Sequence, residues 1–165
     1  MTRTTRRTAL ALLLPLLLLG LLAPPASAAT QAPGVPAASG EGRRIVYSGG
    51  AQRVWLVAED GTVDRTYRVS GKRGTPRPGT YRVFSKSEKA FSTGGVTMRW
   101  MVRFTRGSRL AIGFHDIPRS RSGRPLQSEA QLGTYRSHGC VRQSTADARA
   151  LYDWAPLGTT VVVVR

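Results

Sequence analysis

The strongest constraint on the fold is a strict alternation of side chains that follows Gly94-Gly95. An extended chain places these side chains on two opposite faces, with Met98, Trp100, Val102 and Phe104 on one and Thr97, Arg99, Met101 and Arg103 on the other. A repeat of two residues with one apolar face is typical of a half-buried strand in an antiparallel sheet. The segment therefore predicts a β-rich domain.

Further strand-like runs support this prediction. Val54–Val57 and Val63–Val69 flank a Glu-Asp-Gly turn, which predicts a hairpin. Gly71–Gly79 contains two prolines and is expected to form a rigid turn, because proline cannot donate a hydrogen bond in a central strand. Three more strands are expected, at Thr80–Ser85, Arg109–His115 and Thr159–Val164.

One helix is expected, directly after the only cysteine. Ser144 and Asp147 form an approximate capping pair at its start. Four residues make an apolar stripe at helical spacing: Ala146, Ala150, Leu151 and Trp154. Arg149 and Asp153 are spaced to form an ion pair, and Pro156 and Gly158 end the helix. The residues thus predict a mainly β fold with one short helix.

The first 28 residues have the order of a secretory signal peptide. A basic head that contains Arg3, Arg6 and Arg7 is followed by the apolar run 9–23 and by Ala26-Ser27-Ala28, a small-residue cleavage site. The apolar run is shorter than the ~20 residues that a membrane-spanning helix needs. We therefore expect secretion to the cell wall or the extracellular space, with an uncleaved anchor as the alternative.

The remaining chain divides into a leader and one domain. Residues 29–43 are rich in Pro, Ala and Gly and are expected to form a flexible leader. Residues 44–165 have the length of a single domain.

The chain is strongly basic, with 25 Lys and Arg against 9 Asp and Glu and a formal net charge of +16. Such a balance favours a polyanionic partner. Nucleic acid is not expected, because the expected signal peptide indicates export, aromatic residues make up only 7% and no known nucleic-acid-binding module is found. Anionic polymers of a bacterial-type wall agree with both the charge and the export signal.

Cys140 is the only cysteine, so it cannot form an intrachain disulfide. It lies in Ser137-His138-Gly139-Cys140-Val141-Arg142, where an imidazole, a glycine and an arginine surround the thiol. Acyl transfer by a thiol requires a base to move protons and close backbone N–H groups to hold an oxyanion. Gly139 permits that close approach, and Arg142 lies at a position to bind a substrate carboxylate.

Two alternatives to a catalytic thiol remain open. An unpaired cysteine is often a small buried apolar residue without reactivity. Zinc is the other alternative, with His115, Asp116, His138 and Cys140 as ligands, although these residues lack the paired spacing of common zinc motifs. We expect no metal. The polar, arginine-rich segment 116–132 is expected to be a loop that covers the site.

The Ser-His-Gly-Cys-Val-Arg motif, with His115 upstream, resembles the signature of the L,D-transpeptidase catalytic domain family (YkuD-like). Thr75–Tyr81 is similar to a turn of that family, and the resemblance extends from Arg44 to Val164. It implies a β-sandwich with the short helix after the cysteine.

The resemblance also implies roles for individual residues. They are Cys140 as nucleophile, His115 as general base, His138 and Gly139 at the oxyanion site, and Ser137, Arg142, Trp100 and Met101 in substrate binding. Whether His115 or His138 is the base remains open.

The implied activity is peptidoglycan cross-linking in wall biogenesis. Cys140 would form a thioester with the third residue of a tetrapeptide stem and release the terminal D-alanine, and an amine of a second stem would resolve the thioester. An L,D-carboxypeptidase and a non-catalytic basic wall-associated protein are the alternatives. We expect no cofactor and a monomer whose partners are stem peptides and anionic wall polymers.

Overall fold

The computed structural model describes Met1 and residues 33–165. The expected signal peptide and the first residues of the expected leader lie outside this range. No helix among the described residues is long and apolar enough to cross a membrane.

The first sheet has five strands in the order β3-β2-β1-β9-β4. Their bounds are β1 Arg44–Ser48, β2 Arg53–Val57, β3 Val63–Arg68, β4 Gly79–Arg82 and β9 Thr160–Val164. The predicted hairpin is confirmed as the antiparallel pair β2–β3. The last strand, β9, pairs in parallel with β1 and antiparallel with β4, so it lies between these two strands in the sheet.

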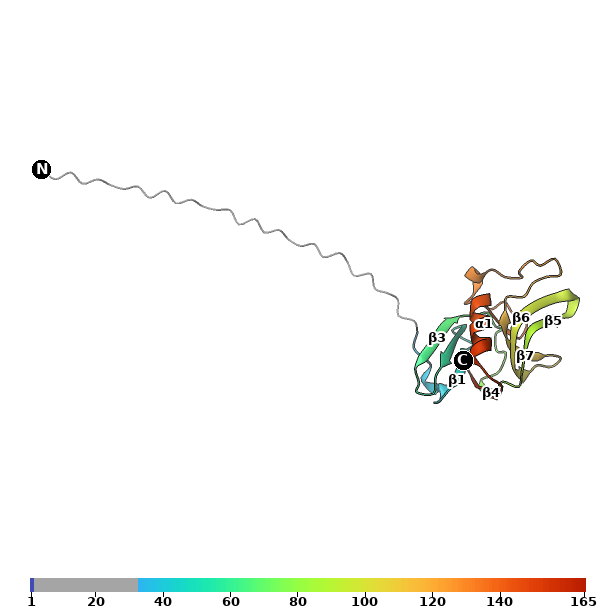
Figure 1. Ribbon diagram of the computed structural model, residues 1–165, viewed down its shortest axis with the longest axis horizontal. Helices are drawn as coiled ribbons and strands as arrows, with labels where there is room; N and C mark the ends of the chain where they lie inside the picture. The colour runs from blue at the N-terminus through green and yellow to red at the C-terminus, as the bar shows by residue number, and fades with distance from the viewer. Residues whose placement is uncertain (2–32) are drawn as a thin grey trace. The chain divides into compact units, whose positions relative to one another are not determined.

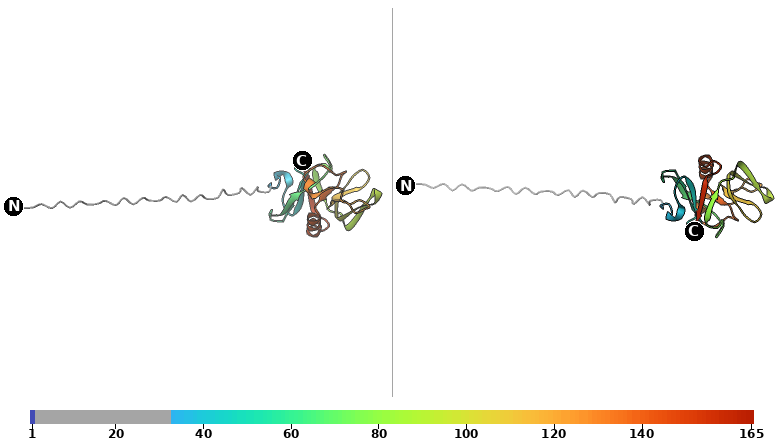
Figure 2. Two further views of the ribbon diagram at one scale, coloured as in Figure 1. Left: turned by 90° about the horizontal axis from the view of Figure 1, so that it is seen from above. Right: turned by 90° about the horizontal axis from the view of Figure 1, so that it is seen from below.

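The second sheet has four strands in the order β5-β6-β7-β8. Their bounds are β5 Ser85–Ser92, β6 Val96–Arg106, β7 Ala111–Asp116 and β8 Val141–Gln143. β6 is antiparallel to β5 and β7, whereas β7 and β8 are parallel. Strands β1 and β3 lie on one side of the domain and β5–β7 on the other (Figures 1 and 2).

One apolar core joins the two sheets. β1 contributes Ile45 and Tyr47, and β7 contributes Ile112 and Phe114. Phe114 stacks on Phe104 with ring centroids 4.8 Å apart and meets Tyr47 edge to face at 6.3 Å. Offset stacking and edge-to-face contacts are the favourable geometries for aromatic pairs. The mainly β, sandwich-like fold with one α-helix is confirmed.

The helix α1 spans Thr145–Trp154 and begins as predicted. The Ser144 hydroxyl accepts a hydrogen bond from the Asp147 N–H at 3.0 Å. The predicted apolar stripe is only partly correct, because the buried helical residues are Ala148 and Leu151 while Ala146 is exposed. The cap fixes where the helix begins, but packing against β6 and β7 decides which face is buried.

The predicted alternation along β6 is wrong at its centre. Trp100 has a φ of 56°, a backbone conformation that bulky residues rarely adopt. Met98 consequently packs with Met101 and Ala90 in a small cluster of its own, while Val102 and Phe104 enter the main core.

The described part of the expected leader, from Pro33 onward, lies against the first sheet. The Trp55 indole donates to the Pro33 carbonyl at 2.8 Å, and Val35 packs on Val46, Trp55 and Val57. Ser39 is only 1% exposed. These contacts contradict a free tether over this stretch, and they arise because the outer face of β1 and β2 is itself apolar.

Candidate active site

Two adjacent parallel strands position the site. His115 lies near the end of β7, and Cys140 immediately precedes β8. The register pairs Phe114 with Val141 and His115 with Arg142. Cys140 and His115, which are 25 residues apart in sequence, therefore lie at the same sheet. The parallel pairing brings them together, and neither residue is close to the other through local chain geometry.

A cavity of about 860 Å³ opens over this sheet. Seven residues that the sequence assigned to the site line it: Met101, His115, Ser137, His138, Gly139, Cys140 and Arg142. Trp100 does not line the cavity, because its ring meets Tyr152 of α1 at 5.4 Å between centroids. The left-handed backbone at Trp100 accounts for the separation of this ring from its neighbour Met101.

His115 is buried and held in one orientation. Its Nδ1 lies 2.5 Å from the backbone carbonyl of Asp116, and its side chain is only 3% exposed. A carbonyl can only accept, so Nδ1 carries the hydrogen and Nε2 keeps its lone pair. Burial lowers the pKa of His115, the hydrogen bond to the Asp116 carbonyl opposes this shift, and the charges of Arg142 and Arg103 add to it, so that the pKa lies at about 4. The ring is therefore a neutral acceptor at neutral pH.

The Asp116 carboxylate has a different role. It accepts a hydrogen bond from the Arg99 N–H at 2.7 Å and does not orient the His115 ring, which binds the Asp116 backbone instead. Burial raises the pKa of this carboxyl group.

Cys140 is half-buried, and its Sγ contacts the Ala111 carbonyl oxygen at 3.8 Å. Burial raises the pKa of the thiol, while a backbone hydrogen bond with Gly113 and the charges of Arg103 and Arg142 lower it. Neither imidazole forms a hydrogen bond with Sγ in the described part of the chain. The resting pair is thus a neutral thiol and a neutral imidazole. Catalytic hydrogen bonds are often loose without substrate and tighten in the reactive complex.

Ser137 closes the loop around the thiol. Its hydroxyl accepts from the Gly139 N–H at 2.8 Å and donates to the Cys140 carbonyl. The Gly139 N–H, which the sequence suggested as an oxyanion donor, is therefore already occupied. The backbone N–H of Cys140 donates to no acceptor among residues 33–165. His138 is exposed at the edge of the same loop.

Arg142 is held by neutral groups. Its backbone forms two hydrogen bonds with Ser70, each 2.9 Å, and its guanidinium donates to the Gln127 amide oxygen at 3.4 Å. Gln127 in turn donates to the Ser70 hydroxyl at 2.7 Å. Burial lowers the pKa of Arg142, which is only 8% exposed. Gln127 was not predicted as a site residue, since it lies in a polar loop far from the motif.

The arginine-rich loop forms one wall of the cavity. Thr97 and Arg119 exchange two backbone hydrogen bonds of 2.9 and 2.8 Å, which fix the loop to β6. Pro118 and Leu126 line the cavity, and the segment ends in the short 3-10 helix Glu129–Gln131.

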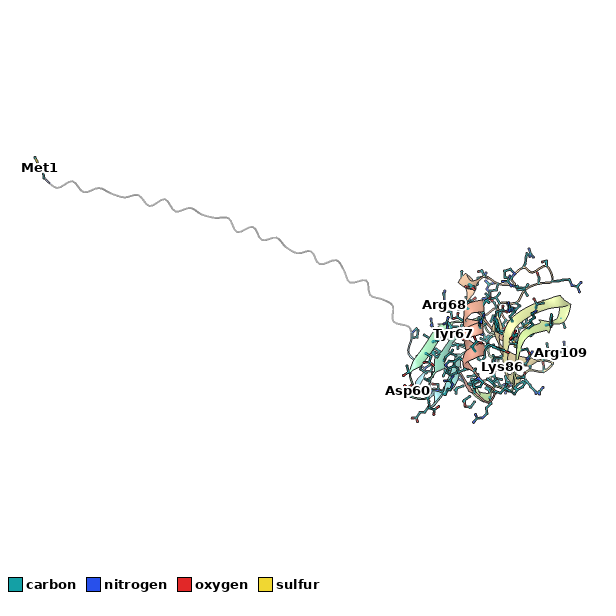
Figure 3. All side chains as sticks on the ribbon, viewed as in Figure 1. Met1, Asp60, Tyr67, Arg68, Lys86 and Arg109 are labelled. Carbon is teal, nitrogen blue, oxygen red and sulfur yellow. The ribbon has the colours of Figure 1, made fainter. Side chains whose placement is uncertain are left out.

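Arg109, which precedes β7 and also lines the cavity, lies on the β5–β7 side of the domain, away from Asp60 (Figure 3).

No group of three carboxylate, imidazole or thiol side chains converges on a metal site within residues 33–165. His115 and Asp116 point to different partners, which separates two of the four ligands considered for zinc.

Comparisons with known proteins agree with this arrangement. The chain is 39% identical over 51 residues to YciB of Bacillus subtilis (strain 168), which is named provisionally as an L,D-transpeptidase; the match covers 30% of the chain and 26% of YciB. An L,D-transpeptidase from Mycobacterium smegmatis aligns with a TM-score of 0.62 at 22% identity, covering 76% and 60% of the two chains. One from Xylanimonas cellulosilytica aligns with a TM-score of 0.58 at 26% identity, covering 76% and 62%.

The chain spans about a quarter of YciB and about three fifths of the two solved structures. The sequence model of the YkuD family, described as the L,D-transpeptidase catalytic domain, matches residues 42–163, which include every residue of the site. The chain therefore belongs to the L,D-transpeptidase catalytic domain family.

Proposed function

We propose that the protein is a secreted L,D-transpeptidase that cross-links peptidoglycan through a thioester on Cys140. One observation carries the proposal: Cys140 and the neutral, oriented ring of His115 line the same cavity from adjacent strands. A thiol next to a base whose other nitrogen is fixed is the arrangement that nucleophilic catalysis requires.

The first half-reaction forms the acyl-enzyme. Sγ of Cys140 attacks the carbonyl carbon of the third residue of a tetrapeptide stem while Nε2 of His115 takes the thiol proton. The Cys140 N–H donates to the oxyanion that forms. The tetrahedral intermediate collapses, the bond to the terminal D-alanine nitrogen breaks, and the imidazolium returns its proton to that amine.

The second half-reaction transfers the acyl group. A side-chain amine of a second stem attacks the thioester, His115 accepts the amine proton, and Cys140 leaves as the thiol. The product is a direct link between the third residues of two stems. The thiol, the imidazole and the two stems supply every atom and proton that these steps require.

The rest of the chain agrees with action at a wall. The basic head and the apolar run 9–23 supply export, and the net charge of +13 that remains without the three arginines of residues 1–28 (16 − 3 = 13) favours retention among anionic wall polymers. If residues 1–28 are removed on secretion, the secreted protein begins at Ala29, which N-terminal sequencing would detect.

Replacement of the nucleophile tests the proposal. The purified protein should convert disaccharide-tetrapeptides into dimers linked through their third residues, as resolved by mass spectrometry of the products. Cys140→Ser should lose this activity and should unfold at the same urea concentration as the wild type. A folded Cys140→Ser variant with unchanged activity would exclude the mechanism, and release of tripeptide without dimer would favour an L,D-carboxypeptidase.

A further inference from the structure

The walls of the cavity carry only one sign of charge. Four basic residues line it, Lys72, Arg103, Arg109 and Arg142, and no aspartate or glutamate does. The ion pairs of residues 33–165 are Arg65–Asp147 and Arg149–Asp153, so none of the four basic residues is neutralised by an ion pair within this range. The cavity is therefore open to an anionic ligand.

Arg103 occupies a special position among the four. It lies on β6 opposite Gly113 of β7, and residues directly opposite each other share one face of a sheet. The β7–β8 register, continued by one residue, places Cys140 next to Gly113 on the other side. Arg103, Gly113 and Cys140 thus form a row across β6, β7 and the residue that precedes β8, and Gly113 places no side chain between the guanidinium and the thiol.

The close packing of β6 and β7 requires a glycine in this row. A Cβ at position 113 would lie 2.9 Å from the Arg103 Cα and closer still to the Val102 carbonyl. The open path between Arg103 and Cys140 is therefore built into the sheet.

Both arginines that flank the thiol are oriented by neutral groups. Arg103 Nη1 donates to the Ser87 hydroxyl at 2.9 Å and to the Ser85 hydroxyl at 3.3 Å. Arg142 is held by the Gln127 amide. Hydroxyl and amide oxygens fix a guanidinium without cancelling its charge, which leaves each fork available to a carboxylate.

We infer that Arg103 and Arg142 form a carboxylate-binding site on either side of Cys140, through which the protein selects donor stems that carry free carboxylates over amidated ones. This inference rests on the proposed function and adds a substrate class to it. Arg103 is the specificity-determining residue in this site.

Two groups of a tetrapeptide stem can supply such a carboxylate. One is the carboxylate at the end of the side chain of a diaminodicarboxylic acid at the third position, and the other is the C-terminal carboxylate of the leaving residue. Both are fully charged at neutral pH, and amidation removes the charge from either.

The test uses three synthetic tetrapeptide donors: one with both carboxylates free, one amidated on the third side chain, and one amidated at the C-terminus. Formation of the Cys140 thioester is followed by intact-protein mass spectrometry, and kcat and KM are measured with each donor. The variants are Arg103→Gln, Arg103→Lys and the control Arg106→Gln. Arg106 lies on the same strand and carries the same charge, but it is exposed and does not line the cavity.

We expect the wild type to prefer the fully free donor over one of the amidated donors by about 10-fold or more in kcat/KM, the size of a charge-assisted hydrogen bond. Arg103→Gln should lose most of this preference through a raised KM for the free donor only. Arg103→Lys should retain part of it, and Arg106→Gln should behave as the wild type. The amidated donor that the wild type uses less well than the free donor identifies which carboxylate is recognised.

Equal rates for all three donors in the wild type would overturn the inference, as would an Arg103→Gln variant that slows every donor equally. In both cases the thioester still forms, so the proposed function survives. If no donor acylates Cys140 in the folded protein, the proposed function itself fails.

Discussion

The buried, neutral state of His115 predicts an unusual acid limit for both stability and acylation. Burial lowers the pKa of His115 from 6.5 to about 4. Between these two pH values His115 is protonated in the unfolded chain but neutral in the folded chain, so the free energy of unfolding falls as the pH falls. The difference of about 2.5 pH units corresponds to about 3 kcal/mol, which is present at pH 7 and lost by about pH 4.

The assay compares the wild type with His115→Gln, which stays neutral at every pH. Urea unfolding at several pH values between 4 and 7 gives the free energy of unfolding for each protein. Carboxyl groups contribute equally to both proteins, so their difference isolates His115. We expect the stability of the wild type relative to the variant to fall by about 3 kcal/mol across this range.

Acylation of Cys140 should follow the same titration. Nε2 of His115 must be unprotonated to take the thiol proton. We therefore expect kcat/KM for a donor stem to decrease when the pH is lowered below about 4 and to show no change near pH 6.5. An NMR titration of the ring protons reads the same pKa without any variant of His115, and His138→Gln identifies the signal because the chain has only two histidines. A midpoint near 6.5 for the ring or for the acid limb would refute the reasoning.

Three other substitutions test the surrounding structure by urea unfolding or by acylation rate. Ser144→Ala should lower the free energy of unfolding by about 1 kcal/mol through loss of the helix cap. Gly113→Ala should destabilise the domain by about 2 kcal/mol or more, because the added Cβ overlaps the β6 backbone, whereas Gly34→Ala meets no atom within 4 Å and should have little effect. Ser137→Ala should slow acylation about 10-fold while the domain stays folded, because the loop around the thiol loses two hydrogen bonds; an unchanged rate would contradict its role in positioning.

Local patterns predicted much of the fold. The Glu-Asp-Gly turn and its flanking apolar runs gave the β2–β3 hairpin, and Ser144 marked the start of α1, because turns and caps depend on neighbours in sequence. β5 was not predicted, since its residues are mostly polar and pair with β6 at the edge of the sheet. The parallel pairing of β9 with β1 was also beyond prediction, because it joins the two ends of the domain.

The motif identified the thiol, but the details of the site depend on three-dimensional contacts. The sequence did not show that Ser137 occupies the Gly139 N–H, or that His115 binds a backbone carbonyl, because both depend on exact loop geometry. Trp100 was assigned to the substrate site, yet its positive φ turns it toward α1. Arg103 was seen only as one polar residue of an alternating strand, and its place beside the thiol follows from the register of three strands.

The most direct test of the account is the intact mass of the protein after exposure to a carbapenem at neutral pH. The family resemblance leads us to expect one covalent adduct, and peptide mapping should place it on Cys140. The adduct should be absent in Cys140→Ser and strongly slowed in His115→Ala, with both variants shown to be folded by their urea unfolding. A folded wild-type protein that acquires no adduct, or an adduct that forms as fast without His115, would contradict a thiol activated by that imidazole.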